Sequence, residues 1–138
     1  MGLSYNPSSV SDGIVLYLDA ANPRSYAGTG TTWYDISGNS NNATFVDSPT
    51  YLSVPQPYFN FDGVNDYVTI PDSTTNRFGN QFSMSLSFYW DGVARTNNNM
   101  FSKRNSSPYN QYGFVVANGD HYNGGTVRIL SFFARPDQ

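Results

Sequence analysis

The residues best placed to do chemistry are carboxylate and amide side chains that gather in one predicted turn. Asp62, Asn65 and Asp66 lie close together in sequence, and their oxygens are the hard ligands that calcium prefers. Asp35 and Asn39 form a second, smaller group. Asp and Asn also stabilise turns by accepting hydrogen bonds from nearby backbone N–H groups. Because neither group has the spacing of an EF-hand loop, we favour the turn-forming interpretation and keep calcium as the alternative.

Glycoside hydrolysis would require two carboxylic acids that flank the scissile bond, one of them with a raised pKa. All ten acidic residues of the chain are Asp, and Glu is absent. No two Asp residues alternate along a predicted core strand, so the pattern offers no acid/base pair. Nucleophilic catalysis has no better support, because His121 is the only histidine, cysteine is absent and no G-x-S-x-G motif occurs. We therefore expect no enzymatic activity and no required cofactor.

Aromatic side chains in predicted loops could stack on the face of a sugar, with Asn, Asp and Gly backbone groups beside them. The candidates are Tyr26, Trp33, Tyr34, Tyr109, Tyr112 and Tyr122. The alternative is that Trp33 anchors its long loop to the core and that the tyrosines cover the ends of sheets. We favour the core role for Trp33 and leave both roles open for the tyrosines.

Charge and hydropathy exclude several other classes of partner. The formal net charge is −3, and the seven basic residues are scattered, so no basic stripe could follow a phosphate backbone. No apolar run approaches the length of a membrane span. The first 13 residues lack the charged and apolar regions of a secretory signal peptide, and we expect no such signal.

The elements that must position these residues are predicted to be short β-strands. Glu is absent and Lys103 is the only lysine, so strong helix formers are scarce, whereas aromatic residues, Gly, Pro and Asn are abundant. The pattern predicts an arm over residues 1–12 and one domain over residues 13–138. Strands are predicted at residues 13–19, 43–46, 58–61, 66–70, 81–90, 99–103, 111–117 and 125–133. Asp62-Gly63 favours a hairpin between the strands at 58–61 and 66–70.

The most regular pattern lies at residues 81–90. Phe82, Met84, Leu86, Phe88 and Trp90 alternate with serines and a tyrosine at a period of two. A helix would distribute these apolar residues around its whole circumference, so the alternation predicts a strand with one face in a core.

Four segments resemble the laminin G-like, concanavalin A-like lectin and glucanase domains, most closely those of tailed-bacteriophage virion proteins. They are GIVLYLDAANPRSY (13–26), TTWYDISGNSNNAT (31–44), FNFDGVNDYVTIP (59–71) and FSMSLSFYW (82–90). The resemblance covers residues 13 to about 117 and implies an all-β, antiparallel jelly-roll sandwich. Beyond that point the usual Trp-centred strand and later hairpin are not found. The fold is therefore expected to be shortened, completed by a partner, or the front portion of a longer product.

The resemblance implies a non-enzymatic structural component of a virion, either a capsid decoration or a tail-associated protein. Its partners would be other virion proteins or further copies of the chain, because an incomplete sandwich exposes strand edges that invite pairing. The alternative function is a carbohydrate-binding module that attaches to surface glycans. Neither function involves nucleic acid or a membrane.

Overall fold

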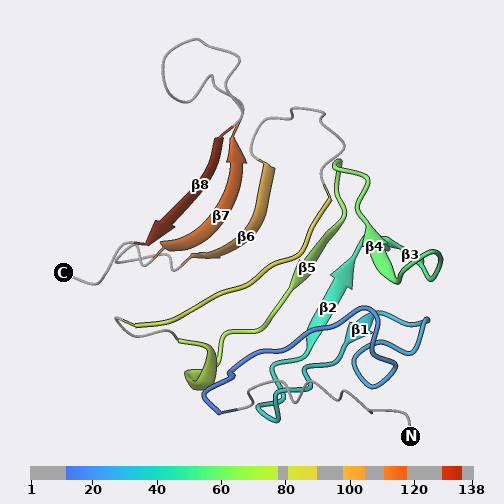
Figure 1. The fold of residues 1–138 in the computed structure, drawn as a ribbon, viewed down its shortest axis with the longest axis horizontal. Coiled ribbons are helices and arrows are strands. Elements are labelled where there is room, and N and C mark those ends of the chain that lie inside the picture. The colour runs from blue at the N-terminus through green and yellow to red at the C-terminus, as the bar shows by residue number, and fades with distance from the viewer. Residues whose placement is uncertain (1–11, 78–80, 90–97, 105–110, 118–128, 135–138) are drawn as a thin grey trace, which may run out of the picture. The chain divides into compact units, whose positions relative to one another are not determined.

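Short antiparallel strands make up the regular structure of the computed structural model, which describes residues 12–77, 81–89, 98–104, 111–117 and 129–134 (Figure 1). The chain divides into two units, Met1–Gly79 and Asn80–Gln138, which we describe separately. The described residues are mostly β, which confirms the predicted class at that level. Their one helical element is η1, a short 3-10 turn at Thr74–Asn76. No helix in the described ranges is long and apolar enough to cross a membrane.

The first sheet of the N-terminal unit has the strand order β1-β2-β5, with all pairs antiparallel. Its strands are β1 (Thr32–Trp33), β2 (Ala43–Val46) and β5 (Tyr67–Thr69). In β2, Ala43 and Phe45 are buried and Thr44 is exposed, as the period of two requires when one face meets the core. The prediction of a strand at residues 43–46 is therefore confirmed with the same bounds.

The second sheet of this unit consists of β3 (Thr50–Leu52) and β4 (Tyr58–Asn60), paired antiparallel. The predicted hairpin between residues 58–61 and 66–70 is wrong, because β4 pairs with β3 whereas β5 pairs with β2. The Asp-Gly turn does form, with Gly63 at a φ of 70°. It carries the chain from one sheet to the other instead of joining two neighbours in the same sheet.

An aromatic cluster joins the two sheets of the N-terminal unit. Phe59 of β4 packs against Phe45 of β2, with ring centroids 4.4 Å apart, and against Tyr51 of β3 at 5.3 Å. Tyr26 meets three of these rings edge-on, at 4.9 to 5.6 Å. Trp33 stacks on Phe45 at 5.8 Å with an interplanar angle of 16°. Aromatic rings pack favourably in these geometries, so the cluster is the core of this unit.

The predicted strand at residues 13–19 is not a strand in the structure, although its side chains are half-buried from Ile14 to Asp19. Its backbone groups bind a neighbouring loop, largely through that loop's side chains. The apolar run therefore predicted the partial burial of this segment correctly. It did not predict that loop side chains, and not a neighbouring strand, would bind its backbone.

The described residues of the C-terminal unit form one sheet with the order β6-β7-β8, again antiparallel throughout. Its strands are β6 (Asn98–Arg104), β7 (Gln111–Ala117) and β8 (Ile129–Ala134). The predicted strands at 99–103 and 111–117 are confirmed, and the described part of the one at 125–133 belongs to β8. The register aligns Phe101, Phe114 and Phe132 across the three strands.

The segment at residues 81–89 belongs to no strand ladder, so the most regular sequence pattern does not yield an assigned strand. Phe82 and Met84 are half-buried between exposed serines, which follows the predicted alternation. Leu86 and Phe88 are 44% and 50% exposed and depart from it. The predicted buried face is therefore limited to the first part of the segment.

Candidate functional site

Residues 35–41, the clip loop, hold residues 14–17, the clipped segment, against the N-terminal unit. The Asp35 Oδ1 atom accepts a hydrogen bond from the Tyr17 N–H at 2.9 Å. In return, the Tyr17 carbonyl accepts one from the Ile36 N–H at 2.9 Å. Tyr17 is thus bonded at both its N–H and its carbonyl, much as a strand residue is in a ladder, but its partners are the Asp35 carboxylate and the Ile36 N–H.

Two asparagines of the clip loop extend this attachment. Asn39 Nδ2 donates to the Ile14 carbonyl at 3.0 Å, and Asn41 Nδ2 donates to the Val15 carbonyl at 2.8 Å. An amide side chain offers the same donor chemistry as a backbone N–H. Side chains thus satisfy backbone groups that a neighbouring strand would otherwise pair.

The Asp35 carboxylate has a full set of hydrogen bonds. Oδ1 also accepts from the Ser37 N–H at 2.9 Å, while Oδ2 accepts from the Ser37 hydroxyl at 2.8 Å and the Asn41 N–H at 2.9 Å. Burial raises the pKa of the Asp35 carboxyl, but hydrogen bonds from Tyr17, Ser37 and Asn41 outweigh burial and hold the pKa below its ordinary value. Asp35 is therefore a charged structural acceptor, and its oxygens are occupied by the clip loop and by Tyr17 of the clipped segment.

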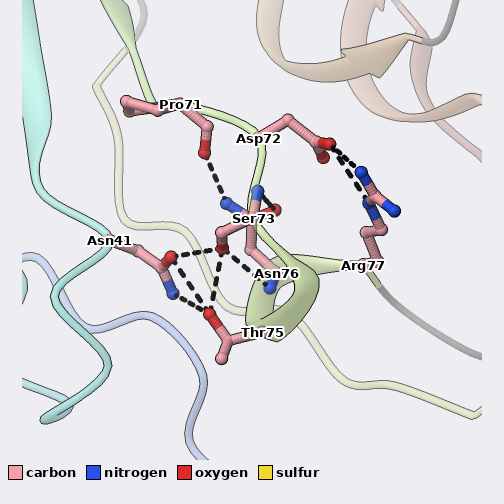
Figure 2. Close-up of polar contacts among 7 residues, drawn as sticks. All are labelled: Asn41, Pro71, Asp72, Ser73, Thr75, Asn76 and Arg77. Atoms are coloured by element: carbon pink, nitrogen blue, oxygen red, sulfur yellow. Dashed lines mark hydrogen bonds and ion pairs between the residues drawn. The ribbon is translucent and has the colours of Figure 1, made fainter.

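Asn41 links the clip loop to η1 (Figure 2). Its side chain is buried, and its Oδ1 atom accepts from the Ser73 hydroxyl at 2.6 Å. Thr75 Oγ1 lies 3.1 Å from the Asn41 amide nitrogen and 2.9 Å from Ser73 Oγ. Because buried polar groups are costly unless they are paired, this closed set fixes η1 against the loop.

A capping box and an ion pair hold η1 in shape (Figure 2). The Ser73 hydroxyl accepts from the Asn76 N–H at 3.3 Å, and Asn76 Oδ1 accepts from the Ser73 N–H at 3.1 Å. The Asp72 carboxylate receives two hydrogen bonds from Arg77, at 2.6 and 3.1 Å, which raise the pKa of the Arg77 guanidinium. This pair is exposed on both sides, so it contributes little to stability.

Tyr26, a predicted sugar-stacking residue, lies in the aromatic core with 7% of its surface exposed. Its hydroxyl donates to the Gly30 carbonyl at 3.1 Å. Burial raises the pKa of the Tyr26 phenol, with a smaller effect from Tyr51, so the hydroxyl stays protonated and able to donate. Such a position leaves little ring surface for a ligand.

Trp33 occupies the core position favoured from the sequence. It packs on Phe45 and, at 4.7 Å, on Phe59. Within the described residues, its buried Nε1 atom has no hydrogen-bond partner. Its ring anchors the loop that follows Tyr26 in the chain.

Tyr34 is the predicted sugar-stacking residue that the structure places at a surface, with 51% exposure. Its backbone is fixed on both sides by Ser25, whose carbonyl accepts from the Tyr34 N–H and whose hydroxyl donates to the Tyr34 carbonyl, each at 2.7 Å. Tyr112 lies within β7 and not in a loop, opposite Lys103 and Ala134. Tyr109 and Tyr122 lie outside the described residues.

The residues predicted as a possible calcium site, Asp62, Asn65 and Asp66, form a turn that is closed by hydrogen bonds to the Asp62 and Asp66 carboxylates. Asp62 Oδ1 accepts from the N–H groups of Val64, Asn65 and Asp66 at 2.8 to 3.3 Å, and Asp66 Oδ2 accepts from the Asp62 N–H at 3.0 Å. This is the turn-forming interpretation that the sequence analysis favoured. In the part of the chain that the structure describes, no cluster of three or more His, Cys, Asp or Glu side chains is arranged to hold a metal.

Sequence reasoning missed several large side chains that the structure leaves at the surface. Tyr58 begins β4 and Tyr67 begins β5, and both are exposed, as are Phe61 and Val64 on either side of Gly63. The alternation in each strand could have predicted this exposure. Tyr58 and Tyr67 are adjacent to the less exposed Phe59 and Val68, and neighbouring side chains of a strand point to opposite faces. Together with Tyr34 and Val54, these are the exposed large hydrophobic side chains among the described residues of the N-terminal unit.

Comparison with known proteins identifies no relative: no family model, curated protein or solved structure matches this chain.

Proposed function

We propose that this chain is a non-enzymatic structural component of a bacteriophage virion, a capsid decoration or a tail-associated protein with a jelly-roll surface. The resemblance in the sequence supports the source and the jelly roll. The observation that carries the structural role is the exposure of large side chains in the N-terminal unit. Tyr34, Tyr58, Phe61 and Tyr67 are between 43% and 51% exposed. Exposed aromatic residues are enriched where proteins bind one another.

The use of the acidic side chains supports a role without catalysis. Asp35, Asp62 and Asp66 all accept hydrogen bonds from the backbone of their own loops. An acid/base pair would need carboxylates that face a substrate and have pKa values moved apart. The Asp35 carboxyl, whose pKa is lowered, is instead a fixed part of the fold.

Peptide mass spectrometry of purified virions from the source of this sequence tests the proposal. We expect peptides of this chain in the particles, at a stoichiometry that repeats between preparations and survives a density gradient. Virions free of the chain, with the chain found only in the surrounding lysate, would contradict a structural role.

Glycan binding is the second candidate, and the geometry of Tyr34 favours it. Its ring is half exposed while its backbone is held by Ser25, and a fixed, open aromatic ring is what stacking on a sugar requires. A glycan array with and without calcium tests this function. We expect Tyr34→Ala to abolish any binding, and Tyr67→Ala, which removes an equally exposed ring from a different element, to retain it.

A further inference from the structure

The two outer strands of the C-terminal sheet differ in how their free edges are protected. Soluble proteins commonly blunt an edge strand with charged residues, a proline or a bulge, because an open edge can pair with another chain. In β6 these devices are present: Lys103 and Arg104 are charged, and the register shifts between Asn99 and Phe101. The edge formed by β6 is thus a poor template for a further strand.

At the opposite edge, β8 has none of these devices. Its sequence is Ile-Leu-Ser-Phe-Phe-Ala, which contains no charge and no proline, and its register with β7 is continuous from Ile129 to Ala134. Among the described strands, β7 is its only neighbour. In an antiparallel ladder every second residue directs both its N–H and its C=O away from that neighbour. These groups form a regular row of donors and acceptors along the edge.

We propose that the β8 edge binds the β8 edge of a second copy of this chain, antiparallel, so that two three-stranded sheets become one continuous sheet. The inference names one partner for the assembling role proposed above, and it can fail while that role stands. An uncharged strand can pair with its own copy without placing like charges opposite each other. The same pairing at β6 would bring basic residues to the interface.

The ladder geometry restricts the register of such a dimer. Residues that point outward from β8 must pair with outward-pointing residues of the second copy, so the two-fold axis passes through a residue position and not between two residues. Near the centre of β8, that position is Ser131 or Phe132. Either choice brings residue 131 of one copy opposite or diagonal to residue 131 of the other.

Two matched substitutions test the proposal, since each edge strand carries a serine near its middle. Ser131→Lys adds a charge to β8, and Ser102→Lys adds the same charge to β6. Native mass spectrometry and light scattering would measure the dimer over a concentration series, and circular dichroism would confirm that each variant folds. We expect a dimer for the parent chain and for Ser102→Lys. For Ser131→Lys we expect a dissociation constant at least about tenfold higher.

A cysteine at the centre of the edge provides a second measurement that does not depend on destabilising the dimer. The chain has no cysteine, so Ser131→Cys or Phe132→Cys introduces a single thiol. We expect one of the two variants to form a disulfide-linked dimer under mild oxidation, because paired residues lie within reach of a disulfide. A strictly monomeric parent chain, or a dimer that Ser131→Lys leaves intact, would overturn the proposal. The virion experiment would remain unaffected.

Discussion

Asp35 and the residue after it, Ile36, bind the backbone of Tyr17, which lies 18 residues before Asp35 in the sequence. The carboxylate accepts the Tyr17 N–H, and the residue after Asp35 donates to the Tyr17 carbonyl. Since the same carboxylate also binds Ser37 and Asn41, its loss would release both the clipped segment and the clip loop.

We therefore expect Asp35→Ala to lower the free energy of unfolding by about 2 to 4 kcal/mol, because several partly buried donors lose a charged acceptor together. Urea denaturation followed by tryptophan fluorescence would measure the change. Asp72→Asn is the control, since it removes an exposed carboxylate paired only at the surface, and it should cost under about 1 kcal/mol. Equal costs would contradict the role assigned to Asp35.

The lowered pKa of the Asp35 carboxyl gives a stability dependence on pH with a definite sign. A group whose pKa is lower in the folded state stabilises that state above its unfolded pKa, and the contribution disappears as the pH falls through the folded value. We expect the parent chain to lose stability below about pH 4, the ordinary range of Asp. Asp35→Asn should show a shallower loss over that range in denaturation curves at several pH values.

Tyr26 should behave as a core residue in mutagenesis. Removing its hydroxyl in Tyr26→Phe deletes one bond to the exposed Gly30 carbonyl, at a cost of about 0.5 to 1.5 kcal/mol. Tyr26→Ala should cost about 3 to 5 kcal/mol, because it also leaves a cavity among Phe45, Tyr51 and Phe59. Thermal unfolding would measure both changes. An Ala variant of parent-like stability would place Tyr26 outside the core.

The segment at 81–89 should respond to charge at one position more than at another. Met84→Asp should destabilise the chain by about 1 to 3 kcal/mol, since it introduces a carboxylate at a half-buried position. Leu86→Asp should change stability by no more than about 0.5 kcal/mol, because Leu86 is largely exposed. Chemical denaturation of the two variants would measure both costs, and a cost for Leu86→Asp as large as that for Met84→Asp would support the buried face predicted over the whole segment.

The sequence predicted local features of the fold better than their partners. The strands at 43–46 and 111–117 were found with the correct bounds, because alternation and flanking turn residues are local signals. The hairpin around Gly63 was not, since a turn fixes a change of direction but not which strand pairs with which. The attachment of residues 14–17 was also missed, because no periodic pattern indicates that side chains of a distant loop will serve as a neighbouring strand.

The candidate site residues also differ in whether local sequence or distant partners determine their structure. The turn of Asp62 and Asp66 could be predicted, because Asp-Gly followed by Asn and Asp is a short-range signal for side-chain to backbone bonds. Tyr26 and Tyr34 belong to similar polar loops, yet one ring is buried and the other is half exposed. Tyr26 is buried because Phe45 of β2 and Phe59 of β4 pack against its ring, and the local sequence around Tyr26 does not indicate those distant partners.

Asp35, Asn39 and Asn41 of the clip loop bind main-chain atoms of residues 14, 15 and 17. These hydrogen bonds do not depend on which side chains those three residues carry. The side chains that determine this attachment therefore belong to the clip loop and not to the segment that it holds. Ile14 and Val15 should accept other apolar residues of similar bulk, whereas positions 35, 39 and 41 should tolerate little change. A designer could consequently graft a different leading segment onto this unit by preserving its backbone path and the bulk of its half-buried side chains.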